Sequence, residues 1–348
     1  MRRIGIWLAV VAVASPAPGR DIFVNNVGGS DTLDGGSHMV ETGNHGPVRT
    51  LRKAMLIADP GDVIRIIPGA EPIREEIAIS GGRQRGGTAR YPIVIEGNGA
   101  VIDGAAPIEV EQFDRLAPQT YRLIGEEGPI HTGGHLFVDG ARANRGRLGS
   151  LAANEFAISS GRYVFKTEPK KSIEDYSFAA GRRTAGLVLY RTNYWIIRGL
   201  TFRNFAGDGA QVRGPAEGIA FEHCRFENNG RAGLAVQVNS KAEVRDCYVE
   251  HNVRAGVLGK AISSVTLERV KISGSAESVA LDETRVREIP GDPRPAPPPR
   301  LPALPERLPT GVEPKRAARA ATPPTDAEPP AAKPPVRSTK PKTPDDDL

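Results

Sequence analysis

Two glutamates, Glu227 and Glu250, occupy matching places in two segments that read alike, "CRFENNGRAG" and "CYVEHNVRAG". If the segments stack as neighbouring strands, the two carboxylates lie about 4.8 Å apart. Like charges at that range raise the pKa of one group unless a cation lies between them. Three interpretations are open: solvated side chains that splay apart, a Ca²⁺ site with oxygen ligands, or an acid/base pair that could act on a sugar.

The same spacing produces further columns of outward-facing charge. One column alternates in sign and reads Arg198, Glu222, Arg245, Glu268; a second reads Gly199, His223, Asp246, Arg269; a third reads Arg203, Glu227, Glu250, Ser273. Alternating signs are typical of cross-strand ion pairs, each worth a few tenths of a kcal/mol. The first column therefore predicts a structural role, and the other two hold candidates for chemistry.

A repeat of 23 or 24 residues creates these columns. Matching apolar positions are Ile197, Phe221, Val244 and Leu267, then Leu200, Cys224, Cys247 and Val270, then Phe202, Phe226, Val249 and Ile272. Such a period indicates a stacked solenoid, because one repeat cannot bury its own apolar face. The Leu-x-x-Leu-x-Leu frame of leucine-rich repeats is missing, and each unit has short β-branched and aromatic runs broken by Gly and Asn. The repeat predicts a parallel β-helix.

The inward and corner positions make two further predictions. Cys224 and Cys247 share an inward column, where a strand spacing of about 4.8 Å exceeds the Cβ separation of about 3.5–4.5 Å in a relaxed disulfide. We expect buried free thiols, even in an exported protein. Asn229 and Asn252 lie one period apart at a corner, a position that suits Asn. Their amides could form a hydrogen-bonded ladder.

The amino-terminal half strengthens the fold prediction. "DIFVNNVGGSD", "GPVRTLRKAMLIADPGDVIRIIPG" and "YPIVIEGNGAVIDG" resemble the opening of secreted right-handed parallel β-helix proteins of the pectate-lyase-like superfamily. Thr50 can cap a short helix with Leu51, Met55 and Ala58 on one side, and Pro60-Gly61 can end it. Such a helix would cover the open end of the solenoid. The resemblance spans residues 21–103 and 185–285, and an insertion is expected at about 104–184, with strands in "HLFVDGARANRGRL" and "SGRYVFKTE".

The resemblance implies a lyase reaction. Polysaccharide lyases of this fold neutralise a uronate carboxylate with Ca²⁺ or a basic residue and remove the α proton with Arg, Lys or His. The candidates that this implies are Arg245, His223, Asp246 and Lys271 for catalysis, Arg203, Arg225 and Tyr248 for substrate binding, and Glu227 and Glu250 for Ca²⁺. No catalytic motif of the family matches residue by residue, and a fold alone does not determine a reaction.

Both ends differ in composition from the rest. Residues 1–14 read as a signal peptide, with Arg2 and Arg3 before an apolar run too short to span a bilayer, and no later segment is a transmembrane candidate. We therefore expect a secreted or periplasmic protein. Residues 288–348 are proline-rich and predict a disordered tail that could bind a partner. The net charge of +5 comes without a nucleic-acid-binding module, so nucleic acid is not an expected partner.

The predicted protein is thus all-β: a right-handed parallel β-helix over residues 15–287 with an N-terminal capping helix and a disordered tail. Binding or cleavage of an acidic polysaccharide along the side of the solenoid is the first functional hypothesis. A non-catalytic cell-envelope or surface scaffold is the alternative, because the coils are few, outward aromatic residues are scarce and no catalytic motif is present. Cofactors are undetermined apart from the Ca²⁺ hypothesis.

Overall fold

The computed structural model describes residues 19–69, 71–81, 86–124 and 134–297. The signal-peptide prediction for residues 1–14 and most of the predicted tail, from residue 298 onward, lie outside these residues. Within them, no helix has the length and apolar character needed to cross a membrane.

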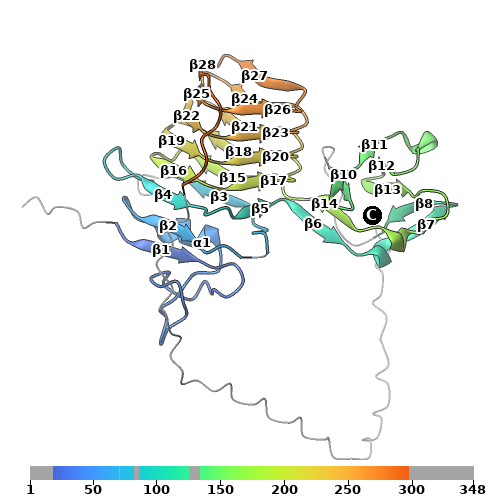
Figure 1. The fold of residues 1–348 in the computed structure, drawn as a ribbon, viewed down its shortest axis with the longest axis horizontal. Coiled ribbons are helices and arrows are strands. Elements are labelled where there is room, and N and C mark those ends of the chain that lie inside the picture. Colours follow the sequence, from blue (N-terminus) through green and yellow to red (C-terminus); the bar gives the residue numbers. More distant parts are fainter. Residues whose placement is uncertain (1–18, 70, 82–85, 125–133, 298–348) are drawn as a thin grey trace, which may run out of the picture. The chain divides into compact units, whose positions relative to one another are not determined.

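Three parallel sheets wind around one core to form a right-handed β-helix (Figure 1). The eight-stranded sheet contains β1 (Asp21–Val24), β2 (Val63–Ile66), β4 (Ile93–Glu96), β16 (Trp195–Arg198), β19 (Ala216–Glu222), β22 (Ser240–Arg245), β25 (Ser264–Glu268) and β28 (Arg285–Ile289). The six-stranded sheet contains β3 (Ile77–Ser80), β15 (Ala185–Tyr190), β18 (Asp208–Arg213), β21 (Ala232–Gln237), β24 (Ala255–Lys260) and β27 (Glu277–Asp282). The third, here called the short-strand sheet, contains β5 (Val101–Asp103), β17 (Thr201–Arg203), β20 (Arg225–Glu227), β23 (Tyr248–Glu250) and β26 (Lys271–Ser273).

The strand register confirms the predicted repeat. Phe221 pairs with Ile197 below it and Val244 above it, and Leu267 follows Val244. In the short-strand sheet, Phe226 lies between Phe202 and Val249 in the same way. These inward side chains are almost fully buried, and the rings of Phe202 and Phe226 stack with centroids 5.3 Å apart. Vertical packing of like residues therefore builds the core.

The corners require left-handed backbone conformations. Between the eight-stranded and short-strand sheets, this position is held by Gly199, His223, Asp246 and Arg269, with φ from 52° to 60°. The next corner has Asn204, Asn228, His251 and Gly274, with φ from 55° to 68°. Asn, Asp and His tolerate this region better than most residues. His223 and Asp246 thus have a conformational role in the turn.

The predicted asparagine ladder is present just inside the second corner. Asn229 donates from Nδ2 to Oδ1 of Asn252 over 2.9 Å and to the carbonyl of Phe202 over 3.2 Å. Its own Oδ1 accepts from the backbone amide of Phe205. Both asparagines are fully buried, so the ladder satisfies backbone groups that the turn would leave without partners.

The amino-terminal end carries the predicted capping helix. Helix α1 (Leu51–Ile57) begins at Thr50, whose side chain accepts from the amide of Lys53 over 3.1 Å. Leu51, Ala54 and Met55 are its buried residues and pack into the solenoid core. Ala58 is the C-terminal cap of the helix.

Residues 104–184, where an insertion was expected, form two further sheets. One has the order β10-β9-β14-β6, with β6 (Ala105–Ile108), β9 (Leu136–Val138), β10 (Ala141–Arg142) and β14 (Phe178–Gly181). The other has the order β11-β12-β13-β8-β7, with β7 (Phe113–Ala117), β8 (Thr120–Leu123), β11 (Asn144–Arg145), β12 (Glu155–Ser159) and β13 (Arg162–Lys166). Short 3₁₀ helices occupy Val110–Gln112, Leu148–Ser150 and Ile173–Asp175. Most pairs are antiparallel, and aromatic and aliphatic residues together form a separate core.

Candidate functional site

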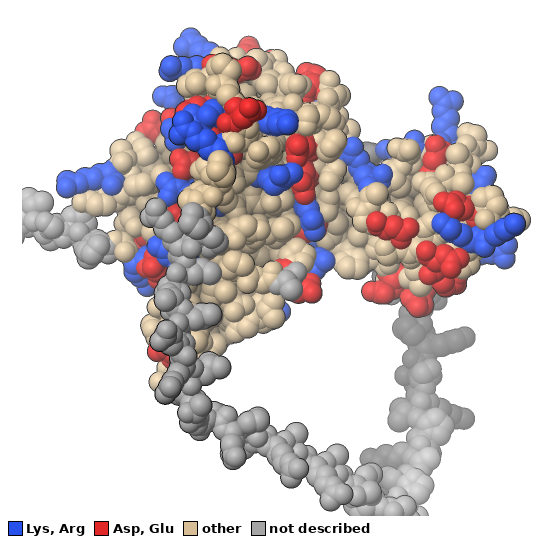
Figure 2. Space-filling model, in the orientation of Figure 1, with Lys and Arg blue, Asp and Glu red and all other residues tan. Residues whose placement is uncertain are grey.

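The outward face of the short-strand sheet brings several of the candidate residues together. Each three-residue strand points its first and third side chains outward. The first positions form the column Val101, Thr201, Arg225, Tyr248, Lys271, and the third positions form the column Asp103, Arg203, Glu227, Glu250, Ser273. Figure 2 shows acidic and basic side chains gathered in a band on this side of the solenoid.

Arg225 is the centre of this face. Its Nη2 lies 2.6 Å from Oε2 of Glu250, and its Nε lies 3.6 Å from Oε2 of Glu227. The guanidinium also lies over the ring of Tyr248, 5.1 Å from the centroid. A cation within the protein therefore neutralises part of the repulsion between the two glutamates. Tyr248 gains a cation–π contact, which favours one orientation of its ring.

Among the described residues, Glu227 and Glu250 are not part of a larger acidic cluster that could hold Ca²⁺. No group of three or more His, Cys, Asp and Glu residues suited to a metal occurs within the described residues. Ca²⁺ takes six to eight oxygen ligands, and Arg225 already contacts both carboxylates. A cation at this place would have to displace the guanidinium.

Arg203 lies lower on the same face and pairs with a residue that sequence reasoning missed. Its Nε donates to Oδ2 of Asp103 over 2.8 Å. Asp103 also accepts from Asn204 Nδ2 and from the amide of Ala105, and its side chain is almost completely buried. The two partners belong to successive coils but lie 100 residues apart in the chain, because the insertion separates them.

Lys271 ends the first outward column and is exposed. It follows Tyr248 in the register of the short-strand sheet. Within the part of the chain that the structure describes, no carboxylate lies within ion-pair distance of its ammonium group. Of the basic residues on this face, Lys271 is therefore the one whose charge is not already shared with an acid.

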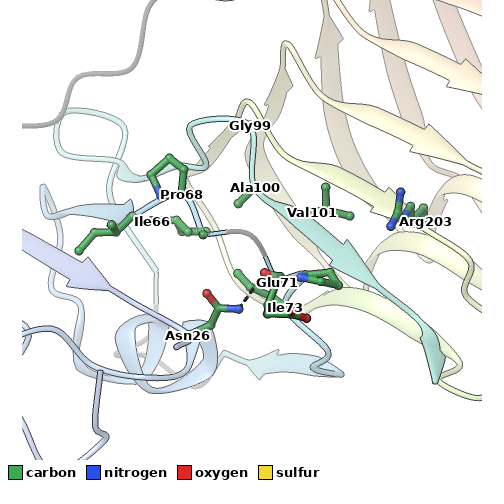
Figure 3. Close-up of a pocket in the computed structure, with 12 residues that line it drawn as sticks. Asn26, Ile66, Pro68, Glu71, Ile73, Gly99, Ala100, Val101 and Arg203 are labelled. Carbon is green, nitrogen blue, oxygen red and sulfur yellow. Dashed lines mark hydrogen bonds between the residues drawn. The ribbon is translucent and has the colours of Figure 1, made fainter. Parts of the chain in front are cut away.

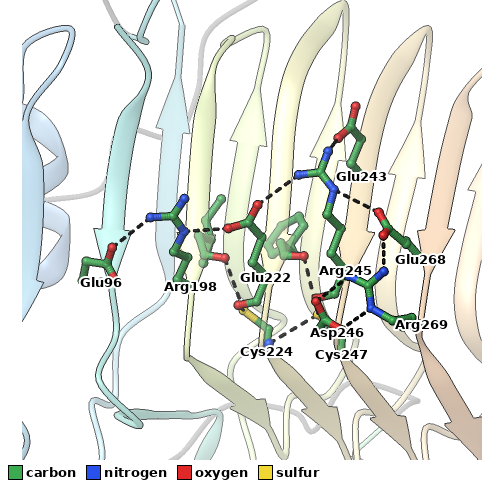
Figure 4. A network of polar contacts seen from close by, with 12 residues as sticks. Glu96, Arg198, Glu222, Cys224, Glu243, Arg245, Asp246, Cys247, Glu268 and Arg269 are labelled. Carbon is green, nitrogen blue, oxygen red and sulfur yellow. Dashed lines mark hydrogen bonds and ion pairs between the residues drawn. The ribbon is translucent and has the colours of Figure 1, made fainter. Parts of the chain in front are cut away.

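Arg245 instead belongs to an ion-pair network on the eight-stranded sheet (Figure 4). Arg198 contacts Glu96 over 3.0 Å and Glu222 over 2.6 Å. Arg245 continues the series, with Glu222 at 3.0 Å, Glu268 at 3.5 Å and Glu243 as a third partner. The predicted cross-strand ion pairs are confirmed, and Glu96 extends the column one coil below the recognised repeat.

Asp246 and His223 lie at the corner between the two sheets, where the chain itself occupies their polar atoms. Asp246 accepts two hydrogen bonds from Arg269, over 2.7 and 2.8 Å, and one from the backbone amide of Arg294 over 2.9 Å. The Nδ1 atom of His223 lies 3.3 Å from the carbonyl oxygen of Arg294. The hydrogen bonds from Arg269 lower the pKa of Asp246 to about 2. A carboxylate with so low a pKa is a weak general base near neutral pH.

The geometry therefore separates the candidates into two groups. Arg203, Arg225, Tyr248, Lys271, Glu227 and Glu250 share the face of the short-strand sheet. His223, Asp246 and Arg245 lie on the corner and on the neighbouring sheet, within contacts that hold the coils together.

A small pocket adjoins the lower end of this face (Figure 3). Its volume is about 120 Å³. Arg203 and Val101 line one end, and Asn26 and Glu71 lie toward the other, where Asn26 Nδ2 donates to the carbonyl of Glu71 over 3.0 Å. The lining comes from four separate stretches of chain, so no local sequence pattern could have identified it.

The two cysteines are buried and free, as expected. The backbone amide of Cys224 lies 3.3 Å from Sγ of Cys247. Burial raises the pKa of the Cys247 thiol well above its usual value. Because the thiolate is the reactive form, this pair is suited to packing and not to nucleophilic chemistry.

Comparison with known proteins supports the fold. Residues 181–287 match the family described as "Right handed beta helix region". A structure titled "Glycoside hydrolase" aligns with a TM-score of 0.51 at 11% identity, covering 72% of this chain and 73% of the other. No curated protein matches the sequence.

Two further structures align less closely. "The complex structure of XylC with xylose" has a TM-score of 0.47 at 11% identity, covering 77% of this chain and 63% of the other. "Crystal structure of pectate lyase Pel9A" has a TM-score of 0.39 at 13% identity, covering 78% of this chain and 62% of the other. The family match over residues 181–287 confirms the right-handed parallel β-helix expected from the resemblance. Similarity to solved structures at this level of identity concerns the fold alone.

Proposed function

We propose that this protein is exported and binds an acidic polysaccharide along the outward face of the short-strand sheet. The observation that carries the proposal is the column of Arg225, Tyr248 and Lys271, in which an aromatic ring lies between two cationic residues on successive coils. A polymer that lies along the solenoid axis meets an equivalent position about every 4.8 Å. Repeating contacts of this kind suit a repeating ligand.

Each member of the column has a physical role in this proposal. The face of the Tyr248 ring that Arg225 does not cover offers an apolar surface to a sugar ring, and the contact with Arg225 favours one orientation of the Tyr248 ring. Lys271 offers a charge that no carboxylate of the described residues neutralises, so an acidic group of the ligand can pair with it. Glu227 and Glu250 can accept hydrogen bonds from sugar hydroxyls.

Cleavage of the bound polymer is a finer form of the proposal. An α-proton abstraction needs a basic side chain next to the uronate, and on this face the basic residues are Arg203, Arg225 and Lys271. Arg203 and Arg225 are each paired with carboxylates. Lys271 is therefore the residue to test for turnover.

The scaffold alternative has one observation in its favour. Arg245, Asp246 and His223, three of the four residues first considered for catalysis, take part in contacts between coils or with residue 294. A purely structural protein would use them in this way. Binding without product formation would leave a non-catalytic glycan-binding protein.

The test is titration calorimetry of the full-length protein with a polyuronate, a sulfated polysaccharide and a neutral glucan. We expect Tyr248→Ala to weaken binding by about 0.5–1.5 kcal/mol, or about 2- to 12-fold, with little change in thermal stability. Tyr91→Ala is the matched control, because Arg90 lies 5.4 Å from the centroid of the Tyr91 ring in a similar pair away from this face. Equal affinities for the two variants would contradict the proposed surface.

Turnover is measured in parallel through the ultraviolet absorbance of unsaturated uronate ends. A signal that Lys271→Gln abolishes, and that Lys241→Gln on the eight-stranded sheet leaves intact, would establish lyase chemistry. Binding with a flat absorbance trace would identify a binding protein, and absence of binding to any polymer would favour the scaffold.

A further inference from the structure

The insertion contacts the solenoid beside the proposed binding face. Strand β10 ends at Arg142, whose Nη1 donates to the backbone carbonyl of His251 over 3.3 Å. His251 directly follows Glu250 of the acidic column. One coil below, a Cβ added to Gly230 would lie 2.6 Å from Nε2 of His135, so the insertion also packs closely there. Strands β9 and β10 therefore border the corner that follows Glu227 and Glu250.

Arg142 differs in its electrostatic environment from the arginines of the proposed binding face. Arg203 and Arg225 each have a carboxylate within ion-pair distance. Within the described residues, Arg142 has none, and its contact is with a carbonyl oxygen. Its side chain is partly buried, and loss of solvation lowers the pKa of its guanidinium.

The neighbouring residue His135 carries no charge next to Arg142 near neutral pH. Burial, and then the positive charges of Arg142 and Arg145, lower the pKa of His135 to about 4. The imidazole is therefore neutral near pH 7. A partly desolvated cation with no acidic partner is costly to maintain. An anion from outside would relieve that cost.

We propose that Arg142 binds the acidic substituent of the polysaccharide, a carboxylate or a sulfate ester, while the sugar rings lie on the short-strand sheet. This inference rests on the proposed function and adds that the insertion supplies a second cation, beside Lys271, for the acidic groups of the polymer. Glu227 and Glu250 repel an anion placed directly over their column, and Arg225 is already shared between them. The acidic group consequently turns toward the insertion, where the planar guanidinium of Arg142 can donate two hydrogen bonds.

The experiment measures the affinity of the full-length protein for a polyuronate, a sulfated glycan and a neutral glucan by titration calorimetry. Arg142→Gln should weaken binding of the acidic polymers by at least about tenfold, the size expected from loss of a charge-assisted contact, and should leave neutral-glucan affinity unchanged. Arg142→Lys should retain part of the affinity, because it keeps the charge and loses the planar fork. Arg115→Gln, an exposed arginine of the same insertion, is the control and should behave as wild type.

The possible outcomes distinguish failure of the role of Arg142 from failure of the proposed polysaccharide binding. If wild type binds the acidic polymers and Arg142→Gln binds them equally well, the role of Arg142 is refuted and the binding face stands. If wild type binds no polysaccharide, the proposed function fails and this inference with it. If Arg142→Gln does not fold, as judged by thermal unfolding, the Arg142→Lys variant provides the test. An Arg142→Lys variant with the same selectivity for acidic over neutral polymer as wild type would refute the proposal. Weaker binding of the polyuronate alone would identify the recognised group as a carboxylate, and weaker binding of the sulfated glycan alone would identify it as a sulfate ester.

Discussion

Removing one side chain of the asparagine ladder tests how much the corners contribute to stability. Asn229→Ala deletes the acceptor of the Phe205 amide and the donor to the Phe202 carbonyl. Both backbone groups belong to buried residues. A buried polar group left without a partner costs about 1–3 kcal/mol. Two such groups predict a loss of roughly 2–6 kcal/mol in the free energy of unfolding.

Thermal and urea unfolding, followed by circular dichroism, would measure this loss. For a large domain, 1 kcal/mol corresponds to about 2–4 °C, so a decrease in Tm of roughly 4–24 °C is expected. Asn228→Gly is the matched control, since Asn228 is the adjacent residue with φ of 58° and glycine adopts this conformation readily. Its stability should stay within about 1 kcal/mol of wild type.

A second substitution at the same position adds a pH test. Asn229→Asp keeps an acceptor for Phe205, but an ionised carboxylate would face the Phe202 carbonyl and the Asn252 Oδ1. Burial and these acceptors raise the pKa of the introduced carboxyl in the folded state. The destabilisation should therefore grow as pH rises through the unfolded-state value of about 3.9 and shrink in acid. An Asn229→Ala variant as stable as Asn228→Gly would refute the reasoning.

Two further predictions concern the corner and the core. Arg269 lowers the pKa of Asp246 from 3.8 to about 2, so the stabilisation from this carboxylate is present above pH 3.8 and is lost as pH falls toward 2. Asp246→Asn should lower the free energy of unfolding by about 1–2 kcal/mol at pH 7. It should also weaken the decrease in stability between pH 3.8 and pH 2, as measured by unfolding at different pH values. Cys224 and Cys247 should resist a thiol reagent in the native protein and react fully in denaturant, whereas rapid labelling of native protein would contradict their burial.

The repeat made most of the solenoid predictable, because a fixed period specifies register as well as fold. Aligning Phe202 with Phe226 and Val249 placed them correctly in one inward column. Thr50 and the apolar residues after it correctly predicted the capping helix. The insertion could not be derived in the same way, because its antiparallel pairs join strands without a period, as when β14 pairs with both β6 and β9.

The candidate site was predictable only in part. Sequence columns correctly grouped Glu227 with Glu250 on one face. They did not show that Arg225, which occupies the neighbouring outward column, reaches both carboxylates, because side-chain direction is not determined by register. Asp103 and Arg142 were missed for a different reason: the insertion separates Asp103 from its stacking partner, and Arg142 approaches the solenoid from outside the repeat.

The way the chain leaves and re-enters the solenoid has a consequence for folding kinetics. The amides of Arg182 and Arg183 both donate to the carbonyl of Gly104, so the two ends of the insertion meet at one point. Joining coils across about 80 residues instead of about 20 adds roughly 1.2 kcal/mol of loop-closure entropy. The insertion has its own aromatic core and mainly local antiparallel pairs, which can form early and shorten the effective loop. Pairing of β5 with β17 thus closes a long loop, and we expect early folding of the insertion to speed the joining of the lower and upper coils.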